Sequence, residues 1–331
     1  MHNENKEGQI MEISTEDNLI ECTYSVKEAF GFNSNIQIAG YKPGHPLTPE
    51  KTKGYVWDTA LVKDAIEWLS EDNPDPLWIS GETGCGKTEF LKNLFAVLGI
   101  PTVFISAKSS TEPDDLLGRI QLRNGNTEFV PGNLLKAYEK GYAIVFDEID
   151  AYPPEVMMAC HRMLERSVLQ LDDGTIIKPA KRSLIGATAN TRGDGHGSHM
   201  YSATHMFNAA TLSRFEKWNM NYPPASVEES ILRNAFGASL DDTLVVAMVK
   251  TAEDIRRAYR DGSCPGPISV RDMLRWGRKL KQSWNRKDVA PIYHSFDKAF
   301  GNGTELHVKQ LLHTLIQSRF GTPAPAIEGL V

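Results

Sequence analysis

Gly81-Glu82-Thr83-Gly84-Cys85-Gly86-Lys87-Thr88 is the stretch of this 331-residue chain that decides its fold. It matches the phosphate-binding pattern G-x-x-x-x-G-K-[ST] at every fixed position. Residues 77–80 before it are apolar, as in a buried parallel strand, and residues 89–95 after it carry apolar side chains at helical spacing. Because the motif requires strand, glycine loop and helix in this order, the sequence predicts a site for the phosphates of a nucleoside triphosphate.

The residues of this loop differ in their expected roles. The backbone N–H groups are expected to surround the phosphates, while Lys87 reaches the β- and γ-phosphates and the Thr88 hydroxyl binds Mg²⁺. The predicted nucleotide-binding residues are Gly81, Glu82, Thr83, Gly84, Cys85, Gly86, Lys87 and Thr88. For Cys85 we expect a small residue tolerated in the loop, and the alternative is a thiol that makes the site sensitive to thiol reagents.

Composition favours a protein of the cytosol. The chain is 41% hydrophobic, which is enough to fill two cores, and no apolar run approaches the ~20 residues that span a bilayer. The N-terminus lacks the basic-then-apolar layout of a secretory signal. The four cysteines are too scattered to indicate disulfides or a C-x-x-C metal site. The net charge of -6 argues against general nucleic-acid binding but leaves a local basic groove open.

The chain divides into three predicted parts. Residues 1–54 form a mobile leader with a short apolar docking element at 26–32. Residues 55–225 alternate apolar strands with helical patterns, which predicts an α/β core with a five-stranded parallel sheet. Residues 226–331 are purely helical and begin with a capping box of Ser226 and Glu229. The five predicted strands are residues 77–80, 102–106, 143–146, 184–187 and 218–222.

Two β-hairpins interrupt the predicted core. The first has strands at 120–123 and 127–130 around Asn124-Gly125, and the second has strands at 168–171 and 175–177 around Asp172-Asp173-Gly174. We interpret them as candidate moving parts, and surface decoration without function is the alternative.

Polar residues follow two of the predicted strands. Asp147 and Glu148 end the apolar run 143–146, and ligands bind at the carboxyl ends of strands in such sheets. We expect Asp147 to hold Mg²⁺, directly or through water, and Glu148 to polarise the attacking water. Asn190 ends another apolar strand and is predicted to contact the γ-phosphate or the water, with a simple turn residue as the alternative.

Two arginines are candidates for contact with phosphate. Arg214 precedes the last predicted strand, and Arg271 opens a helix of the α-helical part. A guanidinium is always charged and can bond phosphate through two donors, which suits a transition state. Taken alone, each arginine is better explained as a surface ion-pair partner.

The glycine loop, the Asp147-Glu148 pair, Asn190, Arg214 and Arg271, in this order, resemble the motifs of the AAA+ ATPases. The resemblance covers residues 55–285. The resemblance makes 81–88 the Walker A loop, 144–148 Walker B, Asn190 sensor 1, Arg214 an arginine finger and Arg271 sensor 2, with ATP and Mg²⁺ as cofactors. The two hairpins and Ser269-Val270-Arg271 resemble the MoxR branch. The stretches 115–118, 145–151, 187–195 and 26–32 resemble the CobS-type ATPase subunit of aerobic cobaltochelatase, although Ser213-Arg214-Phe215 stands where that subunit tends to have Asp-Arg-Trp.

The resemblance implies a homo-oligomer, a hexameric ring, that remodels a protein partner carrying a von Willebrand A-type domain (CobT-like). Two functions remain open: support of cobalt insertion into a tetrapyrrole, or a MoxR-like chaperone with no part in metal insertion. A DNA translocase has less support, given the acidic net charge.

Two further features allow alternatives. The segment 193–208 contains His196, His199 and His205, but a flexible glycine-rich loop explains it better than a metal site does. The predicted helix that contains Arg271 has an apolar stripe of Val270, Met273, Leu274, Gly277, Leu280 and Trp284. Its basic face is expected to be solvated, with an acidic partner as the alternative.

Overall fold

The computed structural model describes residues 19–108, 110–123, 125–171, 173–194 and 204–326. They group into two compact units, and each is described by itself. The first contains residues up to 51 together with 64–80 and 88–219, and the second contains 52–63, 81–87 and the residues from 220 onward. Residues 81–87 of the glycine loop therefore group with the helical part, although the chain enters them from a strand of the first unit.

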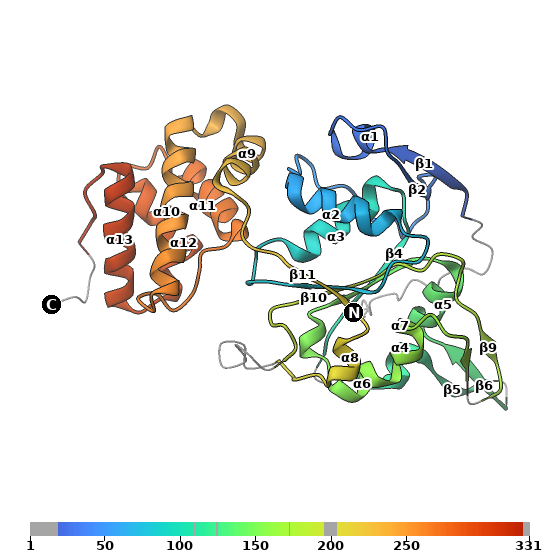
Figure 1. Cartoon of the computed structure of the whole chain (residues 1–331). Coiled ribbons are helices and arrows are strands. Elements are labelled where there is room, and N and C mark those ends of the chain that lie inside the picture. Colours follow the sequence, from blue (N-terminus) through green and yellow to red (C-terminus); the bar gives the residue numbers. More distant parts are fainter. Residues whose placement is uncertain (1–18, 109, 124, 172, 195–203, 327–331) are drawn as a thin grey trace, which may run out of the picture. The chain divides into compact units, whose positions relative to one another are not determined.

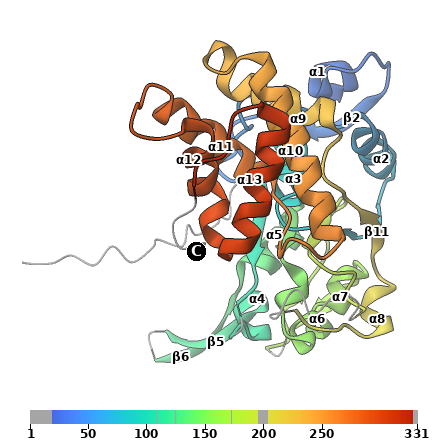
Figure 2. The same cartoon turned by 90° about the vertical axis from the view of Figure 1, so that its left-hand side faces the viewer.

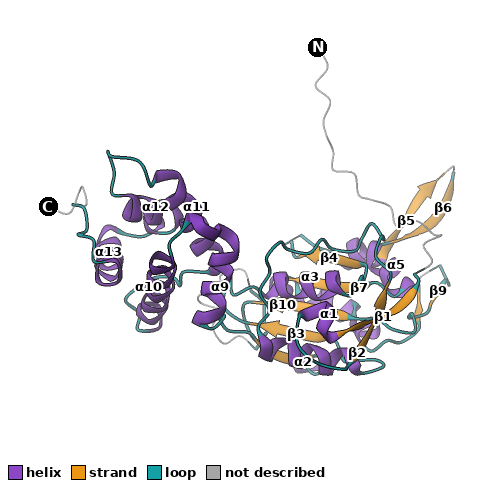
Figure 3. Cartoon of the chain, turned by 90° about the horizontal axis from the view of Figure 1, so that it is seen from above, coloured by secondary structure: helices purple, strands orange, loops and turns teal. Residues whose placement is uncertain are grey.

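A parallel five-stranded sheet is the centre of the first unit (Figures 1 and 3). The order across the sheet is β11-β3-β10-β7-β4, and every neighbouring pair is parallel. The predicted α/β fold with a five-stranded parallel sheet is confirmed. The strands are β3 (Leu77–Ser80), β4 (Thr102–Ser106), β7 (Ala143–Asp147), β10 (Ile185–Ala189) and β11 (Glu216–Asn219).

Helices lie on both faces of the sheet, which explains why the central strands are apolar throughout (Figure 1). Trp78 of β3 packs edge-to-face against Phe207 and Phe215, with ring centroids 5.7 and 5.4 Å apart. The helices between the strands are α2 (Thr59–Ser70), α3 (Lys87–Val97), α4 (Pro113–Leu117), α5 (Asn133–Lys140), α6 (Pro154–Ala159), α7 (His161–Leu164) and α8 (Ala209–Leu212), with a 3₁₀ turn, η1, at Ile149–Ala151.

Both predicted hairpins are present. Strands β5 (Gly118–Arg123) and β6 (Asn126–Pro131) pair antiparallel, with Arg123 opposite Asn126 at the tip (Figure 2). The second hairpin is shorter than predicted, because only β8 (Leu169–Gln170) and β9 (Ile176–Ile177) pair. Ile120 and Leu122 of the first hairpin are exposed, and movement of either hairpin stays a prediction.

Residues 19–51, where the sequence predicts a leader with a docking element, pack onto the first unit. Strands β1 (Glu21–Ser25) and β2 (Gln37–Tyr41) pair antiparallel around helix α1 (Val26–Phe30), whose Ser25–Glu28 capping box is complete. The backbone N–H of Tyr41 donates to the carbonyl of Leu98 over 2.9 Å. Gly40 lies so close that an added Cβ would be 2.2 Å from the Leu98 oxygen. Such short strands depend on this contact, which the local sequence does not reveal.

The second unit is a bundle of helices. A buried core of aliphatic and aromatic residues surrounds Trp276, which is fully buried. The predicted stripe missed Trp276 and included Trp284, which is 49% exposed. The predicted Ser226–Glu229 capping box is wrong, because the first helix begins at Ala225 and its N-cap, Pro224, makes no side-chain cap. The helices are α9 (Ala225–Phe236), α10 (Asp242–Arg260), α11 (Val270–Ser283), α12 (Pro291–Ala299) and α13 (Leu306–Phe320), with 3₁₀ turns at Gly237–Ser239 and Gly301–Gly303.

Within the described ranges, none of the helices has the length and apolar character needed to cross a bilayer.

Candidate nucleotide-binding site

The glycine loop has the backbone that phosphate binding requires. Gly84 and Gly86 have φ angles of 76° and 108°, in the region that favours glycine. Helix α3 begins at Lys87, so the loop ends at a helix N-terminus. Lys87 is 8% exposed, and its ammonium donates to the carbonyls of Gly81 (2.6 Å) and Glu82 (3.1 Å). A buried cation folded over a glycine loop fits a polyphosphate ligand.

Two predicted magnesium ligands lie together in the first unit. The Thr88 hydroxyl donates to Asp147 Oδ1 over 2.6 Å, joining the start of α3 to the end of β7. Thr188 of β10 donates to the same carboxylate oxygen over 2.7 Å. A carboxylate and a hydroxyl in hydrogen-bonding contact form a set of hard oxygen donors, which suits Mg²⁺ bound with several waters.

Glu148 has a strained backbone and an exposed side chain. Its φ and ψ of 54° and 50° are left-handed, which is uncommon for a residue other than glycine. Its N–H donates to the Thr188 hydroxyl over 3.1 Å. Within the described ranges, its carboxylate has no hydrogen-bond partner. Strain of this kind persists where surrounding contacts impose it, and it is often found at functional sites.

Asn190 is held at the end of β10, which lies between β3 and β7 in the sheet. Its backbone N–H donates to Asp150 Oδ2 over 2.9 Å. The N–H and the hydroxyl of Thr191 donate to the same oxygen over 2.8 and 2.9 Å. Asp150 is fully buried and therefore fixes the loop that carries Asn190 relative to the end of β7.

Arg214 lies at the opposite end of the strands from Asp147 and Asn190. It precedes the first residue of β11, so in a parallel sheet it is at the amino edge, whereas Asp147 and Asn190 end their strands at the carboxyl edge. Its guanidinium pairs with Glu165 and donates to the carbonyl of Ala210. Burial and the neighbouring Arg214 lower the pKa of His161, which contacts the Thr211 hydroxyl over 2.7 Å. The structure does not bring Arg214 to the other predicted catalytic residues of the first unit.

Arg271 is the second residue of α11 and is exposed. Ser269 caps this helix, and its Cβ lies 2.4 Å from the position that a Cβ on Gly84 would take. The start of α11 is therefore beside the glycine loop within the second unit, and Arg271 follows Ser269 by two residues. No side-chain partner of Arg271 occurs among the residues with described positions.

Two of the open alternatives can be addressed. Cys85 is buried, and burial raises the pKa of its thiol, which favours a small residue tolerated in the loop over a reactive thiol. His196 and His199 lie outside the described residues. Among the residues that are described, no group of three or more His, Cys, Asp or Glu side chains is placed to hold a metal ion.

Known proteins resemble the part of the chain that carries this site. Residues 76–215 match the AAA domain of the dynein-related subfamily. The chain is 30% identical to the aerobic cobaltochelatase subunit CobS of Sinorhizobium sp over 92% of both chains. This chain belongs to the CobS-like family of AAA+ ATPases.

Other AAA+ relatives are more distant. Protein NorQ of Paracoccus denitrificans is 28% identical and aligns over 56% of this chain and 66% of its own length. Protein CbbQ of Hydrogenophilus thermoluteolus is 26% identical over 66% of this chain and 78% of its own. Among solved structures, a RuvB variant of Thermotoga maritima has a TM-score of 0.47 and 16% identity over 80% of both chains.

Sequence reasoning missed several residues that organise this AAA+ site. Thr188 and Asp150 act through contacts between neighbouring strands, and Tyr222 reaches the loop from the connection before α9. A polar residue inside the apolar run 184–189 was the one signal for Thr188. Asp150 follows Glu148 by two residues and resembles an ordinary surface carboxylate until its burial is known.

Proposed function

We propose that this chain is a Mg-ATP-hydrolysing ring motor that remodels a protein partner. The hydrogen bond between Thr88 and Asp147 carries the proposal, because it joins the two predicted magnesium ligands at the end of the glycine loop. When bound, Mg²⁺ supplies charge neutralisation at the β- and γ-phosphate oxygens. The backbone N–H groups of the loop and Lys87 hold the phosphates. The Lys87 ammonium then donates to phosphate oxygens in place of the carbonyls of Gly81 and Glu82.

In this scheme Glu148 is the general base. Its exposed carboxylate takes a proton from the attacking water, and Asn190 orients that water or the γ-phosphate. Arg271 contacts phosphate from the helical unit, and Arg214 acts at the site of a neighbouring subunit. The products are ADP and phosphate.

Two variants test the division between binding and chemistry. Glu148→Gln should bind ATP nearly as well as the unchanged protein but turn over on the order of 10²-fold more slowly, because the water loses its base. Lys87→Ala should lose ATP binding, because the loop loses its buried cation. Titration with Mg-ATP and steady-state phosphate release measure both. Turnover of Glu148→Gln close to that of the unchanged protein would reject the role of Glu148.

For the partner, the similarity to a protein named as an aerobic cobaltochelatase subunit supports a von Willebrand A-domain protein and a role in cobalt chelation. The similarity to NorQ and CbbQ supports the alternative of a general MoxR-like chaperone. The gene neighbourhood separates them. A large chelatase subunit and corrin enzymes beside this gene favour chelation, and a lone von Willebrand A-domain gene favours the chaperone. The encoded neighbour should then stimulate ATP turnover when it is added to the purified chain.

A further inference from the structure

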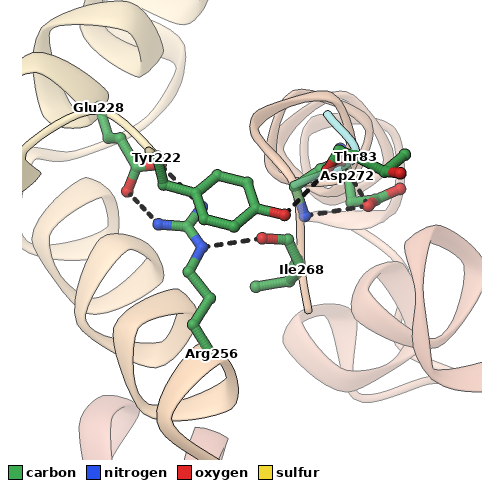
Figure 4. A network of polar contacts seen from close by, with 7 residues as sticks. Thr83, Tyr222, Glu228, Arg256, Ile268 and Asp272 are labelled. Atoms are coloured by element: carbon green, nitrogen blue, oxygen red, sulfur yellow. Dashed lines mark hydrogen bonds and ion pairs between the residues drawn. The ribbon is translucent and has the colours of Figure 1, made fainter. Parts of the chain in front are cut away.

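A polar network within the second unit connects the glycine loop to the start of helix α11 (Figure 4). Its centre is Arg256 of α10, whose side chain is 6% exposed. Two guanidinium nitrogens donate to the carboxylate of Glu228 over 3.0 and 2.7 Å, and Nε donates to the carbonyl of Ile268 over 2.9 Å. Glu228 belongs to α9, and Ile268 lies two residues before the first residue of α11. Arg256 therefore fixes three helices with one planar group.

Tyr222 extends this network to the loop. The Arg256 guanidinium carbon lies 3.9 Å from the centre of the Tyr222 ring, a cation–π contact. The Tyr222 hydroxyl donates to the backbone carbonyl of Thr83 over 2.8 Å. Figure 4 shows the ring between the ion pair and the loop, with its hydroxyl directed toward Thr83. One side chain thus touches both the guanidinium and the backbone that surrounds the phosphates.

A second contact fixes the start of α11 near the loop. Ser269 donates its hydroxyl to Asp272 over 2.6 Å and receives the Asp272 N–H over 3.2 Å, which completes a capping box. Ser269 also packs against Gly84, where there is no room for a Cβ. Arg271 lies inside this first turn. Its position relative to the loop is therefore set by Ile268 on one side and by the capping box on the other.

A purely stabilising ion pair explains less of this arrangement. Replacing a buried ion pair by apolar residues is often neutral or stabilising, so burial of the Glu228–Arg256 pair does not by itself indicate a gain in stability. The pair instead fixes the orientation of its partners, because the planar guanidinium forms a bidentate pair and stacks on a ring at the same time. A lysine would keep the charge and lose this geometry.

We propose that Tyr222 and Arg256 are positioning residues for ATP hydrolysis, which hold the glycine loop and Arg271 in a fixed position relative to each other. The inference rests on the proposed function, in which the loop binds ATP and Arg271 contacts phosphate. Arg271 then contacts the γ-phosphate of the ATP that the loop binds, and the helix that carries Arg271 is connected to the same loop. Loss of this connection should slow turnover more than it weakens nucleotide binding.

The test is a double-mutant cycle with Arg271→Ala. We expect Arg256→Lys and Tyr222→Phe each to lower kcat by about 5–10-fold and to change the Kd for Mg-ADP by less than about threefold. If both act through Arg271, adding either to Arg271→Ala lowers kcat by less than about twofold more. If the fold-losses in kcat of the two single variants multiply in the double variant, the proposal is overturned. Tyr222→Phe keeps the stacked ring, so it decides the question if Arg256→Lys does not fold.

Matched controls exist in the same unit. Arg319 of α13 pairs with Asp254 through two nitrogens, with distances of 2.6 and 2.9 Å, although its side chain is 38% exposed. The Tyr293 hydroxyl donates to the carbonyl of Thr322 over 2.5 Å. Neither bonds to the glycine loop. Arg319→Lys and Tyr293→Phe should leave kcat within about twofold of the unchanged protein. Equal losses in the controls would also overturn the proposal, because the effect would then be general destabilisation.

Failure of this inference can be told apart from failure of the proposed function. If Lys87→Ala loses Mg-ATP binding but the cycle is additive, the ATPase proposal stands and the positioning role is wrong. If Lys87→Ala binds Mg-ATP as the unchanged protein does, the loop is not the ATP site and both proposals fail.

Discussion

At the scale of single residues, Thr188 contacts both residues at the end of β7, the carboxylate of Asp147 and the backbone N–H of Glu148. Its hydroxyl donates to Asp147 and accepts from the N–H of Glu148, so one side chain serves both. The sequence predicts Asp147 and Glu148 and not the residue that contacts both. A motif shows which chemical groups are near each other along the chain, whereas Thr188 comes from the neighbouring strand and is identified only once the strand order is known.

This contact leads to a prediction for Thr188→Val, which keeps the shape and removes the hydroxyl. We expect kcat to fall about tenfold with little change in ATP affinity, because Asp147 loses one of its two hydroxyl donors and Glu148 loses the acceptor of its N–H. Thr102→Val is the control, since Thr102 is also a buried strand threonine but donates to the carbonyl of Ile100. Phosphate-release rates at saturating Mg-ATP check this. Equal rates for Thr188→Val and Thr102→Val would contradict it.

At the scale of elements, the sequence predicts the central strands better than the strand at the edge. Strands β3, β7 and β10 are buried apolar runs, so their positions follow from composition. The last strand is predicted at 218–222 and observed at Glu216–Asn219. Among the described strands it pairs with β3 alone, where Glu216 is opposite Leu77, and this register rather than its own apolar residues sets its limits. The N-terminal strand pair was missed for a similar reason, since it depends on a contact with Leu98.

The connection between β7 and β10 provides a prediction at this scale. Asp150 follows β7 within η1 and accepts three hydrogen bonds from the residues after β10, all at one buried oxygen. Asp150→Asn weakens these charge-assisted bonds and places an amide NH₂ where Asp150 Oδ1 is buried without a partner among the described residues. We expect a loss of about 2–3 kcal/mol in the free energy of unfolding, together with slower turnover because Asn190 is no longer held.

Urea unfolding and ATP turnover measure these two effects. Asp64→Asn, at an exposed position of α2, is the matched control and should change neither. An unfolding midpoint for Asp150→Asn that equals that of the control would show that the three hydrogen bonds contribute nothing to stability.

At the scale of the whole molecule, the parallel sheet separates the predicted arginine finger from the predicted catalytic base. Arg214 precedes β11 at the amino edge, and Glu148 follows β7 at the carboxyl edge. A strand advances by about 3.3 Å per residue, so the four or five residues of these strands place the two edges at least ~13 Å apart. Arg214 is also held by Glu165 and by the carbonyl of Ala210. We propose that Arg214, which lies far from the carboxylates of its own chain, serves the site of another subunit, so that catalysis is shared across a ring.

Mixing two inactive chains tests this proposal. Arg214→Ala keeps its base and Glu148→Gln keeps its finger, and each alone should be nearly inactive, since arginine fingers contribute ~10³-fold or more. In rings formed from equal amounts, about one quarter of the interfaces combine an intact base with an intact finger from the neighbour, so up to about a quarter of the unchanged activity should return. Differently tagged chains and co-purification in the presence of Mg-ATP show whether mixed rings form. Mixed rings without recovered activity would mean that Arg214 acts within its own subunit or not at all. Failure of the chains to associate would reject the ring itself.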